Sequence, residues 1–168
     1  MVVILMGVTG SGKTTVGKLL ANDLGWGYFD ADDFHPPANV EKMRIGVPLD
    51  DADRTPWLET LRNLIRSCLD HGENAVLACS ALKESYRSFL LIDESVKLIY
   101  LKGDYGLIQE RLNKRRGHYM NPKLLDSQFD TLEEPGGDVE IDVSSSPEEI
   151  VKIIKRRLGL LENHGHEL

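Results

Sequence analysis

Short apolar runs alternate with amphipathic stretches along the whole chain. The runs VVILM (2–6), AVLAC (75–79) and VKLIYL (96–101) are nearly continuous, which is typical of strands buried on both faces of a parallel sheet. The aromatic pair at 28–29 predicts another short strand. The run DVEIDV (138–143) alternates between apolar and polar residues, which indicates a strand at the edge of the sheet.

Between these runs, apolar residues recur every three or four positions, as on one face of a helix. The pattern predicts helices over 16–24, 57–69, 83–91, 104–114 and 147–158. Five strands interleaved with helices predict an α/β fold in which helices cover both faces of a parallel sheet. No repeat or linker interrupts the pattern, so we expect one domain over 1–168.

Two segments, 30–53 and 115–122, lack this periodicity and are expected to be irregular. Loops of that length in a compact α/β domain tend to carry function. Trp57 begins the helical stripe after the first of them, so we assign it to the core and not to a surface that stacks a ligand.

The composition excludes several classes of protein. A net charge of −7 leaves no basic excess to neutralise phosphates, which argues against nucleic-acid or anionic-membrane binding. No apolar run approaches the roughly 20 residues of a membrane span. The two cysteines lack CxxC spacing, as in reduced intracellular thiols, and we expect a cytoplasmic protein.

The strongest motif is GVTGSGKT, residues 7–14, which matches the P-loop pattern GxxxxGK[ST] between a predicted strand and a predicted helix. In such a loop the backbone N–H groups surround a polyphosphate. Lys13 would contact the β- and γ-phosphates, and the Thr14 hydroxyl would bind Mg²⁺. The predicted nucleotide-binding residues here are Gly7, Thr9, Gly10, Ser11, Gly12, Lys13, Thr14 and Thr15.

Other motifs narrow the class of P-loop protein. The guanine-reading motif N/T-K-x-D of GTPases is missing, since NPKL (121–124) lacks the aspartate. Ser80 stands where a translocating ATPase would carry an acid after the third strand. Small kinases do not need that acid, because an aspartate after the second strand can hold the metal through water. The sequence therefore favours a small P-loop kinase.

Two acids follow the second strand, where the carboxyl ends of parallel strands face the ligand crevice. In an extended segment Asp30 and Asp32 would point to one side, with Ala31 facing away. We expect Asp30 to hold water on Mg²⁺ and Asp32 to accept the proton of the attacking hydroxyl. Which of the two acids is the base stays open at this stage. Asp33 is assigned to the surface.

Four longer stretches carry a resemblance to a known family. They are DADDFHPPANVEKMRIGVPLDDADRTPWL (30–58), CSALKESYR (79–87), YLKGDYGLIQERLNKRRGHYM (100–120) and SQFDTLEEP (127–135). Together they resemble the gluconate kinase family and, more distantly, shikimate kinase. The resemblance implies the P-loop kinase fold with strand order 2-3-1-4-5 and a lid. It also implies transfer of phosphate from ATP, with Mg²⁺, to the 6-hydroxyl of D-gluconate, which feeds the pentose phosphate pathway, and a homodimer.

A sugar acid requires fixed cations near its carboxylate. Arg54 lies just ahead of the stripe that begins at Trp57, and Lys83 and Arg87 are four residues apart on one predicted helical face. In the family's pattern these three are substrate-side cations. The resemblance also places His118 and Gln128 near the sugar acid and implies a substrate-binding insert over about 32–56. His35, inside this insert, is a candidate for substrate contact, and a capping or packing role for it stays open. Arg44 is assigned to the surface.

Four cations within six residues, 111–116, precede Gly117, which suits a lid over about 115–122 that closes on the triphosphate. Arg111 and Arg115 are four residues apart and can act together, one near adenine and one on the transferring phosphate. Together with Lys13 and Asp32, Arg115 completes the predicted catalytic set. By analogy with related kinases, the loop at 144–147 contacts the edge of the adenine.

Two alternatives stay open. One is a kinase for another small molecule, such as shikimate or a nucleoside monophosphate, although few aromatics are available in 30–58 to stack a base. The other is a regulatory module that binds nucleotide but has lost transfer activity. The intact set of predicted catalytic residues argues against the second.

Overall fold

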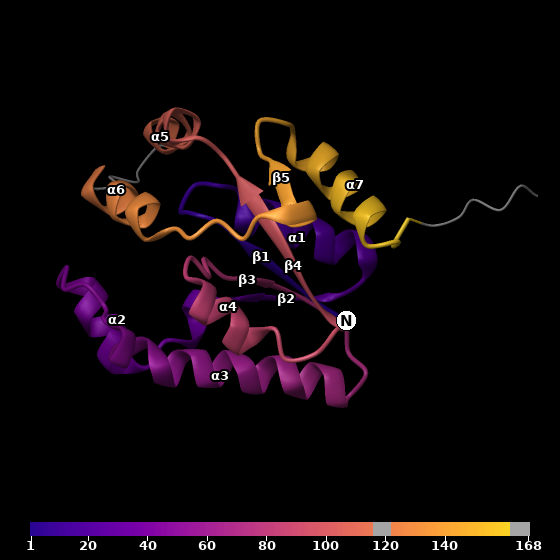
Figure 1. The fold of residues 1–168 in the computed structure, drawn as a ribbon, viewed down its shortest axis with the longest axis horizontal. Helices are drawn as coiled ribbons and strands as arrows, with labels where there is room; N and C mark the ends of the chain where they lie inside the picture. The colour runs from indigo at the N-terminus through magenta and orange to yellow at the C-terminus, as the bar shows by residue number, and fades with distance from the viewer. Residues whose placement is uncertain (116–121, 162–168) are drawn as a thin grey trace, which may run out of the picture.

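A computed structural model describes residues 1–115 and 122–161. Its centre is a five-stranded parallel sheet with the order β2-β3-β1-β4-β5, which confirms the predicted order (Figure 1). The strands are β1 (Val2–Met6), β2 (Gly27–Asp30), β3 (Ala75–Ala78), β4 (Val96–Lys102) and β5 (Glu140–Asp142).

The position of each strand in the sheet explains its sequence pattern. β1 is central, pairs with β3 on one side and β4 on the other, and is buried over its whole length. A strand covered on both faces needs a continuous apolar run. β5 is an edge strand, as predicted, but only three residues long, because 137–139 form a 3-10 turn before it.

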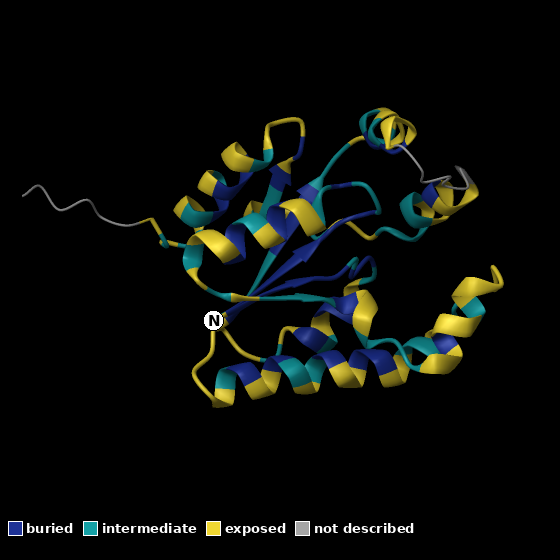
Figure 2. Ribbon diagram, turned by 180° about the vertical axis from the view of Figure 1, so that it is seen from behind, coloured by how far each residue is buried: buried dark blue, intermediate teal, exposed yellow. Residues whose placement is uncertain are grey.

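Helices cover both faces of the sheet, so the core has two halves (Figure 2). Val3 and Leu5 of β1 pack toward one half, and Val2, Ile4 and Met6 toward the other. The first half takes α1 (Lys13–Leu24), α5 (Tyr105–Lys114), α6 (Pro122–Thr131) and α7 (Pro147–Arg157). The second half takes α3 (Asp51–Asp70) and α4 (Glu84–Leu90).

The expectation that 30–53 is irregular is wrong. The segment contains a 3-10 turn, Ala31–Phe34, and α2 (Pro37–Arg44), and only 45–50 connects α2 to α3. α2 was missed because Asn39 is its only buried residue, so it shows no apolar stripe. A signal was present nonetheless, since Pro37 occupies the first helical position, where proline is favoured.

Helix α3 begins six residues before Trp57, where the apolar stripe starts. The Asp50 side chain accepts from the Asp53 backbone N–H at 2.7 Å, and Asp53 accepts from the Asp50 N–H at 3.0 Å. This reciprocal capping box starts the helix at Asp51. Arg54 therefore lies in the first turn of α3 and not ahead of the helix.

The assignment of Trp57 to the core is confirmed, since the residue is 4% exposed and its indole nitrogen donates to the Ala31 carbonyl at 2.7 Å.

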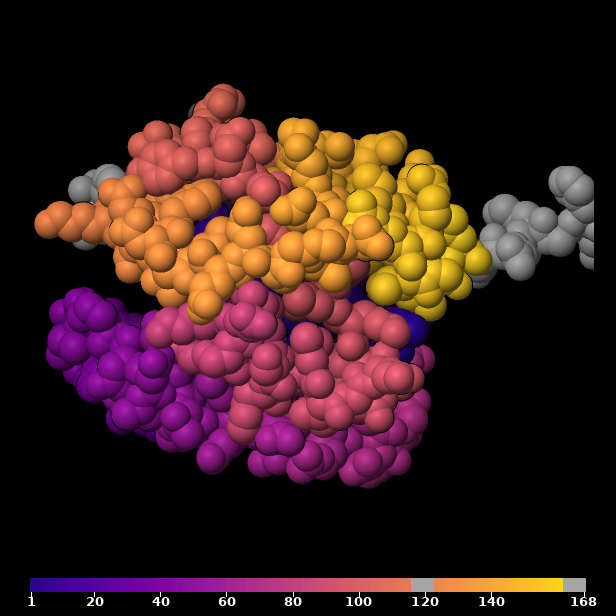
Figure 3. Space-filling view, in the orientation of Figure 1, coloured from indigo at the N-terminus to yellow at the C-terminus, as the bar shows by residue number. Residues whose placement is uncertain are grey.

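The surface of the molecule is hollowed between α2, in purple, and α6, in orange (Figure 3). Within residues 1–115 and 122–161, no helix is both long and apolar enough to cross a membrane.

Candidate active site

The P-loop joins β1 to α1 and can be built only with glycine at two of its turns. Gly10 and Gly12 have φ angles of 79° and 99°, in the left-handed region that side chains disfavour. A Cβ on Gly10 would also lie 2.9 Å from Leu112 of α5. The loop thus packs closely on α5, and Gly12 stands at the N-terminal end of α1, where unpaired N–H groups attract phosphate.

Lys13 is held inside the loop. Its ammonium group donates to the backbone carbonyls of Gly7 at 2.8 Å and Val8 at 2.9 Å. Burial lowers its pKa to about 8, although the carboxylates of Asp32 and Asp30 partly oppose the shift. In the ligand-free protein the charged form of Lys13 is therefore less strongly favoured over the neutral amine than in an exposed lysine. An anion bound beside Lys13 would stabilise the charged form.

The Ser11 hydroxyl is buried in the same loop and has no hydrogen-bond partner among residues 1–115 and 122–161. A buried polar group without a partner is costly, so a ligand that accepts from it would be favoured. Thr14 and Thr15 follow at the exposed start of α1. The loop thus presents the features that a polyphosphate group requires.

The two acids lie at the carboxyl end of β2. The expectation that the segment from Asp30 to Asp32 is extended is wrong, because Ala31–Phe34 form a 3-10 turn. Asp30 caps the 3-10 turn, and its side chain accepts from the Asp32 N–H at 2.9 Å. Asp32 remains accessible to water, yet the surrounding protein partly desolvates its carboxyl group. This desolvation, with the negative charge of Asp30, raises the pKa of Asp32, while His35 and Lys13 oppose the shift. The mutual influence of Lys13 and Asp32 places the acid beside the phosphate cradle.

Of the predicted substrate-side cations, the structure brings two together at the starts of α3 and α4. The Asp51 carboxylate lies 3.0 Å from the Lys83 ammonium and 4.0 Å from the Arg54 guanidinium. The Tyr86 hydroxyl donates to the same carboxylate and accepts from Arg54 at 3.2 Å. We call these four residues the α3–α4 cation cluster, with a formal charge of +1. Sequence reasoning missed Asp51 and Tyr86, although both lie inside the motifs that carried the resemblance.

Arg87 is not part of this cluster. It is 5% exposed, and its guanidinium donates to the carbonyls of Ala81 at 2.9 Å and Leu82 at 3.1 Å. Ala81 has a φ of 44°, the only positive φ of a non-glycine residue in the described parts of the chain. Arg87 therefore stabilises the strained loop that leads to Lys83, and its predicted contact with substrate stays a prediction.

The lid-side arginines border a pocket of about 370 Å³ on the P-loop. The Arg111 guanidinium donates to the Val143 carbonyl, and Arg115 is exposed at the end of α5. The pocket combines the P-loop, α5 and the loop after β5, as predicted for a nucleotide site. Its lining residues are Gly10, Ser11, Gly12, Thr15, Val16, Arg111, Lys114, Arg115, Ser145, Pro147 and Ile150.

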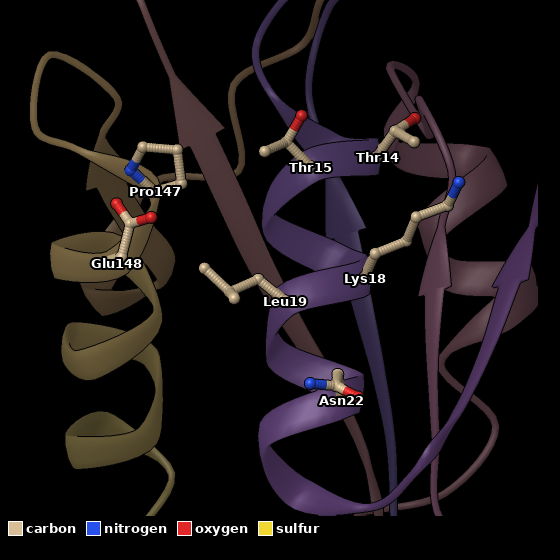
Figure 4. Close-up of a pocket in the computed structure, with 7 residues that line it drawn as sticks. All are labelled: Thr14, Thr15, Lys18, Leu19, Asn22, Pro147 and Glu148. Carbon is tan, nitrogen blue, oxygen red and sulfur yellow. The ribbon is translucent and has the colours of Figure 1, made fainter.

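A second, more open groove continues from this pocket along the outside of α1. Thr15 and Pro147 line both hollows, and Figure 4 shows the groove between the starts of α1 and α7. Leu19 and Asn22 line its far end. The groove and the pocket together form one continuous surface beside the P-loop.

Gln128 contacts the P-loop, and its predicted place near the sugar acid stays a prediction. Its side-chain oxygen accepts from the Thr9 backbone N–H at 2.6 Å, which ties α6 to the phosphate cradle. His118 and most of the predicted lid lie outside the described residues. Arg44 forms an exposed pair with Glu41 at 2.6 Å, in agreement with its assignment to the surface.

Comparisons with known proteins agree with this geometry. The family model for shikimate kinase matches residues 9–157. A gluconokinase of Gluconobacter oxydans is 48% identical over 136 residues, which cover 80% of this chain and 76% of that protein. The chain belongs to the gluconokinase family. The members of this family are kinases, and the fold places them beside shikimate kinase.

Solved structures of the gluconokinase family support the same assignment. The crystal structure of a gluconokinase from Sinorhizobium meliloti has a TM-score of 0.82 and 36% identity, covering 96% of this chain and 97% of that chain. A shikimate kinase from Aquifex aeolicus, at 20% identity and a TM-score of 0.61, covers 95% of this chain and shares the fold alone. The P-loop kinase fold is thereby confirmed.

Proposed function

We propose that this gluconokinase-family kinase transfers the γ-phosphate of ATP to the 6-hydroxyl of D-gluconate. The observation that carries the proposal is the α3–α4 cation cluster, which is separate from the phosphate cradle and presents two cations to a second anion. A sugar acid has a carboxylate for such a cluster and a distant hydroxyl for the acid beside Lys13. The named gluconokinases among the relatives support the same acceptor.

The positions of the side chains support the following proposed roles. The P-loop N–H groups and Lys13 would bind the β- and γ-phosphates, with Arg111 and Arg115 bordering the nucleotide pocket. Asp32 accepts the hydroxyl proton as the new oxygen–phosphorus bond forms and the bond to the departing ADP breaks. Arg115 is the candidate to stabilise charge on the transferring phosphoryl group.

The residues present suit Mg²⁺. This ion keeps several waters and takes few protein ligands, so a hydroxyl from Thr14 and a water held by Asp30 are an adequate donor set. Among the residues that the structure describes, no three His, Cys, Asp or Glu side chains gather into a metal site. When bound, Mg²⁺ neutralises charge on the phosphates.

Arg54 and Lys83 would bind the substrate carboxylate, with His35 and the predicted His118 along the sugar chain. The proposed insert over about 32–56 then corresponds to the 3-10 turn, α2 and the first turn of α3. One domain over 1–168, a lid over about 115–122, a homodimer and a cytoplasmic location stay predictions.

A coupled assay of ADP release tests the function. We expect turnover that depends on gluconate, with none for nucleoside monophosphates. Shikimate is the informative competitor, because the shikimate kinase model matches most of the chain and shikimate is also a hydroxy acid. ADP release at background level with gluconate, or equal turnover with shikimate, would overturn the proposal.

A further inference from the structure

A buried asparagine links α2 to the first turn of α3 beside the acids. Asn39 is 3% exposed, and its side-chain nitrogen donates to the Asp53 backbone carbonyl at 2.8 Å. The same nitrogen lies 3.3 Å from Nδ1 of His35. The sequence analysis singled out His35 but assigned no role to Asn39.

The carbonyl contact determines which atom of Asn39 faces His35. A backbone carbonyl can only accept, so the amide nitrogen, and not the amide oxygen, must point toward Asp53. That NH₂ group has a second hydrogen, and it faces Nδ1 of His35. Nδ1 must therefore accept, and the hydrogen of the neutral imidazole is carried on Nε2.

The ring itself is held by Trp57. The two rings stack with centroids 4.4 Å apart and planes at 13°, and Trp57 is anchored by its bond to the Ala31 carbonyl. With its plane fixed and Nδ1 toward Asn39, the imidazole presents its Nε2–H on the opposite side. Stacking on Trp57 and the hydrogen bond from Asn39 thus restrict the imidazole of His35 more than is usual for a surface histidine, which keeps its rotamer freedom.

Two charged groups face this imidazole, Asp32 from the 3-10 turn and Arg54 from α3. Burial lowers the pKa of His35, Arg54 lowers it further, and Asp32 opposes both. The net shift favours the neutral ring at neutral pH. His35 thus has the proposed base and one cation of the proposed carboxylate-binding cluster as its charged neighbours.

We propose that Asn39 is a positioning residue that holds His35 as an Nε2–H donor, and that this N–H binds a mid-chain hydroxyl of a polyhydroxylated acid. The placement of the acceptor rests on the proposed function, whereas the form of the ring does not. A donor cannot also remove the proton of the reacting hydroxyl, so the arrangement leaves that task to Asp32. It also gives the site a reason to prefer polyols over deoxygenated analogues.

The form of the ring can be measured in the free protein. Long-range ¹H–¹⁵N correlation spectra report which ring nitrogen carries the hydrogen, and we expect Nε2–H for His35. His71 provides an internal reference of opposite form, because its Nδ1 lies 2.7 Å from the Ser67 backbone carbonyl and must donate. Nδ1–H on His35 would overturn the proposal whatever the substrate is.

A double-mutant cycle tests the link to catalysis. His35→Gln supplies an amide N–H near the Nε2 position. Because a glutamine amide has no tautomers, it does not need Asn39 to determine which nitrogen carries the hydrogen. Asn39→Ala should reduce kcat/KM for the acceptor about threefold to tenfold in the wild-type background, the range for one hydrogen bond. In the His35→Gln background the same change should have little effect.

Equal losses in both backgrounds would mean that Asn39 only attaches α2 to α3, and would refute the positioning role. Binding of an ATP analogue, whose site does not include Asn39, reports whether each variant is folded. If Asn39→Ala does not fold, the spectrum of the wild-type protein still decides the form of His35. Failure of gluconate as acceptor would appear in the wild-type assay and is thus distinguishable from failure of this inference.

Discussion

Raising the pH is expected to weaken ATP binding through one group, Lys13. Its ammonium is buried against two backbone carbonyls, and burial lowers its pKa to about 8 in the ligand-free protein. A bound triphosphate adds negative charge beside the ammonium and raises that pKa again. Binding therefore takes up a proton whenever Lys13 is neutral in the free protein.

The sign and size follow from this linkage. The affinity is at its full value below about pH 8 and falls by about tenfold for each further pH unit, until the pKa of the complex is reached. Between about pH 7 and about pH 9 the deprotonated fraction of free Lys13 rises from about a tenth to about nine-tenths, so the dissociation constant should rise about tenfold.

Calorimetric titration with a non-hydrolysable ATP analogue, at constant ionic strength across this range, measures the effect. Lys13→Arg is the matched control, because arginine stays charged and its binding curve should be flat with pH. A wild-type affinity that does not change up to about pH 9 would show that the carbonyl cage leaves the Lys13 pKa near its ordinary value.

Three further predictions concern the acids and the cations. Asp32→Asn should abolish turnover but leave ATP-analogue binding nearly intact, and lost nucleotide binding would contradict the role of Asp32 as base. In the wild type, the raised pKa of Asp32 should move the acidic limb of the kcat/KM profile above the ordinary aspartate range. Asp51→Asn removes an anion from the cation cluster and should lower KM for gluconate about twofold to fivefold at low salt. Glu41→Gln, the same charge change on exposed α2, should have no effect, and a rise in KM for Asp51→Asn would show that Asp51 mainly orders the cations. Arg87→Met should lower the free energy of unfolding by about 1 to 3 kcal/mol, measured by urea denaturation, because the buried Ala81 carbonyl loses its donor while the Leu82 carbonyl keeps the Glu133 backbone N–H. Unchanged stability with lost gluconate affinity would instead favour direct substrate contact.

The parts of the fold that could be predicted are those in which a single physical requirement determines which residue type occurs at each position. β1 had to be apolar throughout because it lies between β3 and β4 with helices on both faces. The P-loop could be recognised because its glycines meet a local backbone requirement that is independent of the rest of the chain. Helix α2 could not, because its one buried residue is a polar asparagine.

The candidate site divides in the same way. The sequence by itself determined the phosphate cradle, the acids after β2 and the cationic motifs, since each depends on residues close together along the chain. Only the tertiary structure separated Arg87, a buried support of the loop at Ala81, from Lys83, four residues earlier and paired with Asp51 on another helix. The physical reason is that a charged side chain acquires its role from the groups it meets across the fold, and spacing along one helix does not specify those groups.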